Sequence, residues 1–297
     1  MTAVAASSEA TGGRSRLGRA PEPTAVMAQA SSENFPVASR LLPGGVRGDL
    51  LAVYGFARLV DDAGDEAPGD RLALLDELES DLERAFAPAG VPSHPLIAAL
   101  RPVVRRRSLP IAPFQRLIEA NRRDQLVHRY ASFDELVDYC ALSANPVGEL
   151  VLGILEAATP ERVALSDHVC TGLQLVEHWQ DVAEDFARGR VYLPSEDLEH
   201  FGVAEKDLAA GAPTSAFKRL MAAEVGRARR LLAEGAPLIR TLTGRAAFAV
   251  AAFVAGGRSA LAAIERADFD VLSSRPRPGA ALRAYYLIAT LTQREGR

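Results

Sequence analysis

The stretch DLLAVYGFARLVDDAGDEA (49–67) joins an apolar run at helical spacing to a dense set of acids. The acids occupy four of six consecutive positions: Asp61, Asp62, Asp65 and Glu66. Counting at helical spacing puts Tyr54, Arg58, Asp61 or Asp62, and Asp65 on one face of a helix. Like charges at this spacing destabilise a helix unless a cation lies among them. The stretch therefore predicts a helix that presents carboxylates to a bound cation.

A second acidic set, in EHWQDVAEDFARGR (177–190), repeats this pattern on another amphipathic helix, predicted over residues 166–186. Glu177, Asp181 and Asp185 lie at i, i+4 and i+8, so they form one stripe along that helix. The opposite flank is apolar, which suits a helix that lines a cavity better than one that faces solvent. Mg²⁺ prefers carboxylate oxygens together with substrate phosphates. Two facing acidic pairs therefore predict a magnesium and diphosphate site.

Arginines lie beside both acidic sets and would complete the charge balance of a bound diphosphate. Arg58 precedes the first set, and Arg188 and Arg190 follow the second. A single acidic run would be interpreted as solvated surface charge, because charged side chains are mostly exposed. Two runs with the same DxxxD spacing, each on an apolar helix and near arginine, favour the binding site.

Helical periodicity dominates the rest of the chain and predicts an all-α domain of about ten helices. Residues 71–86 carry leucines three or four apart, and 217–235 is amphipathic and ends at a glycine. The apolar run 246–255 is predicted to be a buried helix that stops at the glycine pair following it. No alternating apolar and polar run is flanked by turn signals, so no sheet is expected.

Composition narrows the classes of function. The formal net charge of −4 and the absence of a basic patch argue against a nucleic-acid partner. Two cysteines provide neither a disulfide framework nor a metal-binding spacing, which favours a cytoplasmic location. Residues 1–30 are expected to be a disordered tail and 31–297 the folded domain. No run approaches the ~20 apolar residues of a membrane span, and association with the inner membrane surface is left open.

The two motifs AVYGFARLVDDAGDE (52–66) and LQLVEHWQDVAEDFARGRVYLP (173–194) together resemble the squalene/phytoene synthase family. Supporting stretches lie at 122–140 and 143–155, and the likeness covers about residues 33–275. The resemblance implies a single-domain all-α isoprenoid-synthase bundle around a central apolar cavity. It also implies Mg²⁺ as cofactor and a prenyl diphosphate as substrate.

Carried over position by position, the resemblance implies a role for each matching residue. The implied metal ligands are Asp61, Asp65, Glu177, Asp181 and Asp185. The implied diphosphate contacts are Arg58, Arg188 and Arg190. Tyr54 and Tyr139 would face the cavity near the reacting carbons, and Asp124 would assist from the metal side. Glu177 stands where the family usually has Asn, which keeps an oxygen ligand but adds a charge and a methylene.

Within the family, four stretches resemble the hydroxysqualene synthases, which convert presqualene diphosphate to hydroxysqualene. They are ENFPVASRLLP (33–43), SANPVGELVL (143–152), WQDV (179–182) and IERADFDVLSSRPR (264–277). In the third, Gln180 stands where presqualene- and phytoene-forming members usually have Arg. This likeness implies capture of a cation by water, with Tyr139, Asn145 and His178 as candidates for holding that water. A flavin-dependent reductase is the downstream partner it implies.

Two other functions stay open at this point. One is the head-to-head condensation of two prenyl diphosphates, by a presqualene diphosphate, squalene or phytoene synthase. The other is a non-catalytic helical scaffold, which Glu177 favours. The sequence DVAED at 181–185 argues against a head-to-tail prenyltransferase, whose second motif would be another DDxxD.

Overall fold

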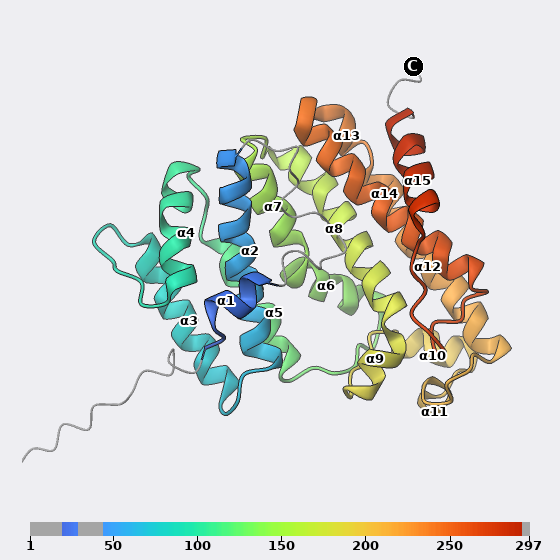
Figure 1. Cartoon of the computed structure of the whole chain (residues 1–297). Coiled ribbons are helices and arrows are strands. Elements are labelled where there is room, and N and C mark those ends of the chain that lie inside the picture. The colour runs from blue at the N-terminus through green and yellow to red at the C-terminus, as the bar shows by residue number, and fades with distance from the viewer. Residues whose placement is uncertain (1–19, 29–43, 293–297) are drawn as a thin grey trace, which may run out of the picture.

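The computed structural model describes residues 20–28 and 44–292, and every regular element in these ranges is a helix (Figure 1). The helices are α1 (Pro23–Ala28), α2 (Gly44–Asp65), α3 (Arg71–Phe86), α4 (Pro95–Arg106), α5 (Ala112–Asp124), α6 (Phe133–Ser143), α7 (Asn145–Ile154), α8 (Pro160–Gln180), α9 (Val182–Ala187), α10 (Ser195–Phe201), α11 (Glu205–Leu208), α12 (Ser215–Gly235), α13 (Leu238–Thr241), α14 (Gly244–Arg266) and α15 (Ala280–Thr292). The all-α prediction is confirmed. The predicted number of helices was too low, because helices of four to seven residues leave no periodic pattern.

Two hydrophobic clusters form the core. One is built from α2 to α5 with α7, and the other extends from α5 to α14 around α8. Phe56 and Phe114 meet edge to face in the first cluster, with ring centres 5.3 Å apart, and Trp179 is fully buried in the second. Each such side chain contributes roughly 1.5–3 kcal/mol on burial. The acid-bearing ends of α2 and α8 therefore belong to different clusters.

Helix α8 is the centre of the second cluster and packs against α7, α12 and α14. The prediction that the apolar helix stops at Gly256-Gly257 is wrong, because α14 continues to Arg266. A Cβ atom at Gly257 would come within 2.7 Å of Leu173 Cδ2 on α8. This glycine therefore permits a close approach of two helices rather than ending one.

Helix α14 is also, among the described residues, the one helix whose length and composition would let it cross a membrane. The share of its apolar window that is buried inside the fold is 67%. Burial of this extent is expected of a core helix, which passes the same test of length and hydropathy.

Of the tail predicted over residues 1–30, residues 20–28 are described, and Pro23–Ala28 form α1 beside α2. A Cβ atom at Gly55 of α2 would lie 3.1 Å from Met27 Sδ, so the two helices are close. The rest of the predicted tail, and the stretch at 33–43 that resembles hydroxysqualene synthases, lie outside the described residues.

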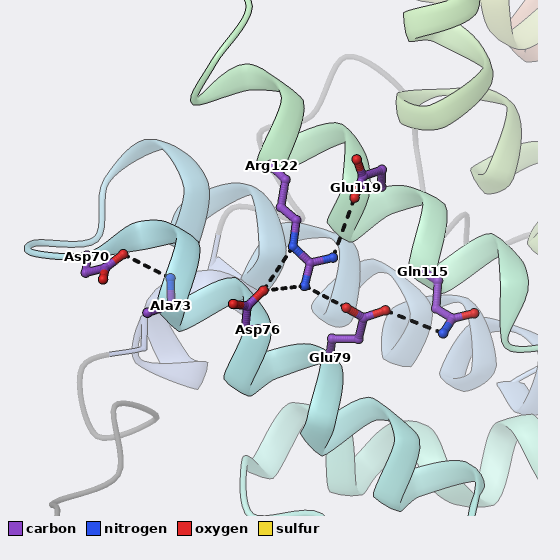
Figure 2. A network of polar contacts seen from close by, with 7 residues as sticks. All are labelled: Asp70, Ala73, Asp76, Glu79, Gln115, Glu119 and Arg122. Carbon is purple, nitrogen blue, oxygen red and sulfur yellow. Dashed lines mark hydrogen bonds and ion pairs between the residues drawn. The ribbon is translucent and has the colours of Figure 1, made fainter.

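A polar network fixes α5 against α3 (Figure 2). Arg122 Nη2 lies 2.6 Å from both Asp76 Oδ1 and Glu79 Oε2 of α3. Gln115 adds a hydrogen bond to Glu79, and Glu119 lies 3.6 Å from Arg122. The neighbouring residue of α5, Asn121, faces α2 instead. This network therefore holds the end of α5 where Asn121 can reach the first acidic motif.

Candidate active site

The carboxylates of the first motif lie within the last turns of α2, which continues to Asp65. Asp61 Oδ1 accepts a hydrogen bond from Asn121 Nδ2 at 3.0 Å, whereas Asp62 is buried and pairs with Arg58 Nε at 2.8 Å. Of the two alternatives left by helical spacing, Asp61 is therefore the residue turned toward α5. Tyr54, one turn before Arg58, is half-buried.

Gly64 makes the contact between α2 and α5 possible. A Cβ atom at this position would lie 2.4 Å from Asn121 Oδ1, and the Gly64 carbonyl accepts a hydrogen bond from Gln125 Nε2. Burial raises the pKa of Asp61 to about 6, although the hydrogen bond from Asn121 and the charge of Arg58 oppose the increase. The positive charge near Asp61 therefore does not offset the cost of burying its carboxylate.

Arg190 connects the two acidic motifs across the molecule. Its Nη2 atom lies 2.7 Å from Asp65 Oδ1, and its charge also lowers the pKa values of Asp124 and Asp185. Burial and the neighbouring Asp181 carboxylate nevertheless raise the pKa of Asp185 to about 7. The prediction that the motifs face one another is supported by this shared arginine.

The second motif departs from the continuous helix predicted over 166–186. Helix α8 ends at Gln180, α9 begins at Val182, and Asp181 between them has φ −105° and ψ 11°. Aspartate is a weak helix former because its carboxylate competes for other partners. Here the partner is Arg275, whose Nε atom lies 2.7 Å from Asp181 Oδ1. Glu177 remains one turn before Asp181 and is half-buried.

The three predicted diphosphate contacts differ in their surroundings. Arg58 and Arg190 are mostly buried and pair with acids of the first motif. Arg188 is largely exposed and pairs with Glu184 at 2.8 Å, so in this structure it lies at the edge of the site.

An aromatic cluster lies beside these charges. The Tyr139 hydroxyl donates a hydrogen bond of 2.7 Å to Asp124 Oδ2, so these two predicted residues do lie together. The His178 ring stacks on Tyr192 with centres 3.8 Å apart, and Tyr130 stacks on Tyr192 at 5.8 Å. Burial lowers the pKa of His178 to about 3, which keeps its imidazole neutral at physiological pH.

A small cavity opens between the aromatic cluster and the second motif. Its walls include His178, Tyr192, Asp185, Arg190 and the apolar Val182 and Leu208. It encloses about 10 Å³, roughly the space that one water molecule needs. The larger central apolar cavity implied by the resemblance stays a prediction.

Sequence reasoning missed four residues that the structure brings to the site: Asn121, Tyr130, Tyr192 and Arg275. Tyr130, Tyr192 and Arg275 lie inside stretches that carried the family resemblance, so a signal existed for these three. The role of Asn121 depends on how α5 packs on α2, which local spacing does not reveal.

The donor atoms at the site fit Mg²⁺ in their chemistry. The implied ligands offer only carboxylate oxygens, which this hard cation prefers. The raised pKa values of Asp61 and Asp185 indicate acids that a divalent cation would stabilise. As the described part of the chain stands, no three acidic, histidine or cysteine side chains converge closely enough to hold a metal. Asp65 and Asp181 are instead held by arginines.

Comparison with known proteins places this site in a family. The family model described as squalene/phytoene synthase matches residues 28–281. A hydroxysqualene synthase of Zymomonas mobilis is 37% identical over 182 residues, and the aligned part is 59% of this chain and 59% of that relative's length. A 15-cis-phytoene synthase of Synechococcus elongatus is 32% identical over 260 residues, 82% of this chain and 83% of the relative.

A solved structure agrees with these sequence relatives. The squalene synthase HpnC from Alicyclobacillus acidocaldarius has a TM-score of 0.77 and 42% identity to this chain, over 86% of this chain and 99% of its own. The family match spans both acidic motifs, the aromatic cluster and the segment that carries Arg275. The chain belongs to the squalene/phytoene synthase family.

Proposed function

We propose that this chain is a hydroxysqualene synthase, which ionises presqualene diphosphate and lets water capture the resulting cation. The observation that carries this choice within the family is Gln180. Its side chain is buried, and its amide donates a hydrogen bond to the Pro276 carbonyl. A neutral amide here means one cation fewer than in members with Arg at this position. That suits a reaction that releases one diphosphate rather than one that binds two.

Several charged groups of the chain suit departure of a diphosphate. Arg58 and Arg190 each lie within ion-pair distance of an acid, so their guanidinium groups are already held in the site before substrate arrives. Planar guanidinium groups bind phosphate oxygens bidentately. When bound, Mg²⁺ held by Asp61, Asp65, Glu177, Asp181 and Asp185 would neutralise charge on the leaving diphosphate as a Lewis acid.

The aromatic cluster suits the carbocation that remains. The faces of Tyr139 and Tyr192 carry partial negative charge and attract cations without reacting as a free carboxylate would. Burial raises the pKa of Tyr139 well above its usual value, so its hydroxyl keeps its proton and donates a hydrogen bond to Asp124. The cluster therefore offers a desolvated surface in which a cation can rearrange before capture.

The capturing water belongs beside this cluster. Asn145 is engaged by a hydrogen bond of 3.0 Å from Thr171, whereas Tyr139 and His178 both face the cluster, with ring centres 6.2 Å apart. We place the water in the cavity walled by His178 and Tyr192, which has room for about one molecule; the Tyr139 ring contacts both of these rings. The product still carries a hydroxyl that must be removed reductively, and we expect a flavin-dependent reductase to do this. A cytoplasmic location stays a prediction.

Product analysis tests this proposal. Purified protein with Mg²⁺ and presqualene diphosphate should release diphosphate and hydroxysqualene without NADPH, and oxygen from ¹⁸O-labelled water should appear in the product. Formation of squalene only when NADPH is present would contradict the proposal.

Condensation of two prenyl diphosphates is the second candidate function. The phytoene synthase relative favours it, because it aligns over more of this chain than the hydroxysqualene synthase of Zymomonas mobilis does. Incubation with farnesyl or geranylgeranyl diphosphate alone separates the two, since only a condensing enzyme forms a product from them. For a non-catalytic scaffold, neither incubation yields product and Mg²⁺ with diphosphate leaves the melting temperature unchanged.

A further inference from the structure

The outer face of α15 is apolar and largely exposed, and its Tyr285 ring meets the Tyr286 ring of the same helix edge to face, with centres 5.3 Å apart. Tyr285 and Ile288, three positions apart on this face, are 64% and 62% exposed. Ala281 and Ala284 continue the same exposed stripe, so it follows the spacing of one helical face. The opposite face packs on α14 through Leu282 and the partly buried Tyr286 (Figure 1).

The charge around this stripe is positive. The described residues 271–292 contain three arginines, Arg275, Arg277 and Arg283, and no acid, a formal charge of +3 in a chain whose overall formal charge is −4. Arg283 is exposed on α15 itself, and Arg277 is exposed in the segment before it. α15 contains no acidic residue. The stripe is thus an apolar surface with a basic border.

We infer that the exposed stripe of α15, formed by Ala281, Ala284, Tyr285 and Ile288, docks the protein on the surface of an anionic lipid bilayer. A helix with an apolar face and arginine at its border lies in the interface between head groups and acyl chains. Tyrosine is enriched at that depth because its ring is apolar and its hydroxyl is polar. Anionic lipids attract the exposed arginines Arg277 and Arg283.

A second copy of this chain fits the stripe less well. A two-fold contact would place the same basic segment of each copy next to the other, which is a repulsive arrangement. The stripe has two large apolar side chains on one helix, whereas a stable dimer buries about 800 Å² on each partner. The apolar run of α14 is not an alternative docking surface, because most of it is buried.

The segment before α15 connects the stripe to the candidate active site. Arg283 Nε donates a hydrogen bond of 3.1 Å to the Pro278 carbonyl, which fixes the start of the helix. Three residues before Pro278, Arg275 pairs with Asp181, and Gln180 holds Pro276. A docked α15 would therefore bring the site near the bilayer, into which the apolar chain of a prenyl diphosphate would partition. This last point rests on the proposed function, whereas the docking itself does not.

Vesicle flotation tests the inference with the full chain. The wild-type protein should float with phosphatidylcholine vesicles that contain about one-third phosphatidylglycerol, and far less with phosphatidylcholine alone. Binding to the vesicles should weaken as the salt concentration is raised, because salt screens the attraction between the arginines and the anionic head groups. The double variant Tyr285→Ser/Ile288→Ser should bind these vesicles with a partition constant at least about tenfold lower than that of the wild type.

The matched control is Val91→Ser, which removes an even more exposed apolar side chain (75% exposed) from the loop between α3 and α4. This variant should float like the wild type. Circular dichroism and the melting temperature check that the double variant is folded. Three results would overturn the inference. The double variant could float as well as the wild type, or the wild type could fail to float at all. The third is a wild-type dimer that the double variant converts to a monomer.

Discussion

Arg190 is the single residue on which the charge balance of the candidate site depends most. It contacts Asp65 directly, and its charge lowers the pKa values of Asp124 and Asp185. Its guanidinium is mostly buried, so solvent screens these interactions only partly. Without this cation, Asp65 of the first motif and Asp185 of the second would lose nearby positive charge.

We expect Arg190→Gln to lower turnover of presqualene diphosphate at least about 100-fold, the usual effect of losing one preorganised charge at a transition state. The measurement is the rate of diphosphate release under saturating Mg²⁺. Arg229→Gln is the control. Arg229 of α12 forms an ion pair with Glu265, near the C-terminal end of α14, and this variant should leave the rate unchanged. Equal rates for both variants would rule out the role given to Arg190.

Glu224 is a buried acid outside the candidate site. Its side chain is fully buried on α12, where Glu224 Oε1 lies 2.9 Å from Arg227 Nη1, and the same guanidinium pairs with both oxygens of Asp197. Burial raises the pKa of Glu224 from 4.5 to about 8, against the charge of Arg227. The folded state therefore binds this proton more tightly than the unfolded chain does. Stability contributed in this way is present below about pH 4.5 and is lost as the pH rises to about 8.

Glu224→Gln keeps the shape of the side chain and removes its titration. The melting temperature of the variant, relative to that of the wild type, should therefore be higher at pH 8 than at pH 5. Thermal unfolding of both proteins at these two pH values measures the difference. Glu265→Gln, which removes a partly exposed acid paired with Arg229, should show the same small effect at both. A difference for Glu224→Gln that does not change with pH would show that this carboxyl does not titrate in that range.

At the scale of helices, long periodic segments were predictable from the sequence alone. The leucines of residues 71–86 are spaced for one face, and α3 has those bounds, with Leu75, Leu78 and Leu82 fully buried. The same spacing put Arg58 on one face with Asp61 or Asp62, and in the structure Arg58 pairs with Asp62. These features depend on contacts within one helix, which the sequence displays directly.

Features that depend on distant partners could not be predicted. The break at Asp181 involves Arg275, almost a hundred residues further along the chain. The continuation of α14 through its glycine pair depends on Leu173 of α8 and Leu232 of α12. Asn121 reaches Asp61 because α3 and α2 both hold α5. In each case the deciding neighbour comes from another element, so no local pattern reports it.

Gly235 gives a test of packing between elements. A Cβ atom there would lie 2.7 Å from the Leu165 carbonyl oxygen and 2.8 Å from Val169 N, both backbone atoms of α8. Backbone atoms cannot rotate away, so Gly235→Ala should destabilise the fold by about 1–3 kcal/mol. At Gly226, in the same helix, the nearest atom is the side-chain Nη1 of Arg230, 3.8 Å away, and Gly226→Ala should stabilise by up to about 1 kcal/mol. Chemical denaturation distinguishes the two, and equal effects would contradict the close contact.

At the scale of the whole molecule, the candidate site joins two cores. Asp61 and Asp65 lie on a helix of the first hydrophobic cluster, and Asp181 and Asp185 lie beside the second. The ion pair between Arg190 and Asp65 spans 125 residues of chain and connects them. A ligand held by both motifs would bind only the complete fold, so it should stabilise both cores together.

The most direct test of this account is the shift in melting temperature caused by Mg²⁺ with inorganic diphosphate, measured for Asp61→Ala, Asp181→Ala and the double variant. If the motifs hold one ligand jointly, each single variant should lose nearly the whole shift, and the double variant should lose no more. Helical circular dichroism should be preserved in all three. Single variants that each keep about half of the shift, with losses that add in the double variant, would show two independent sites and would contradict the account.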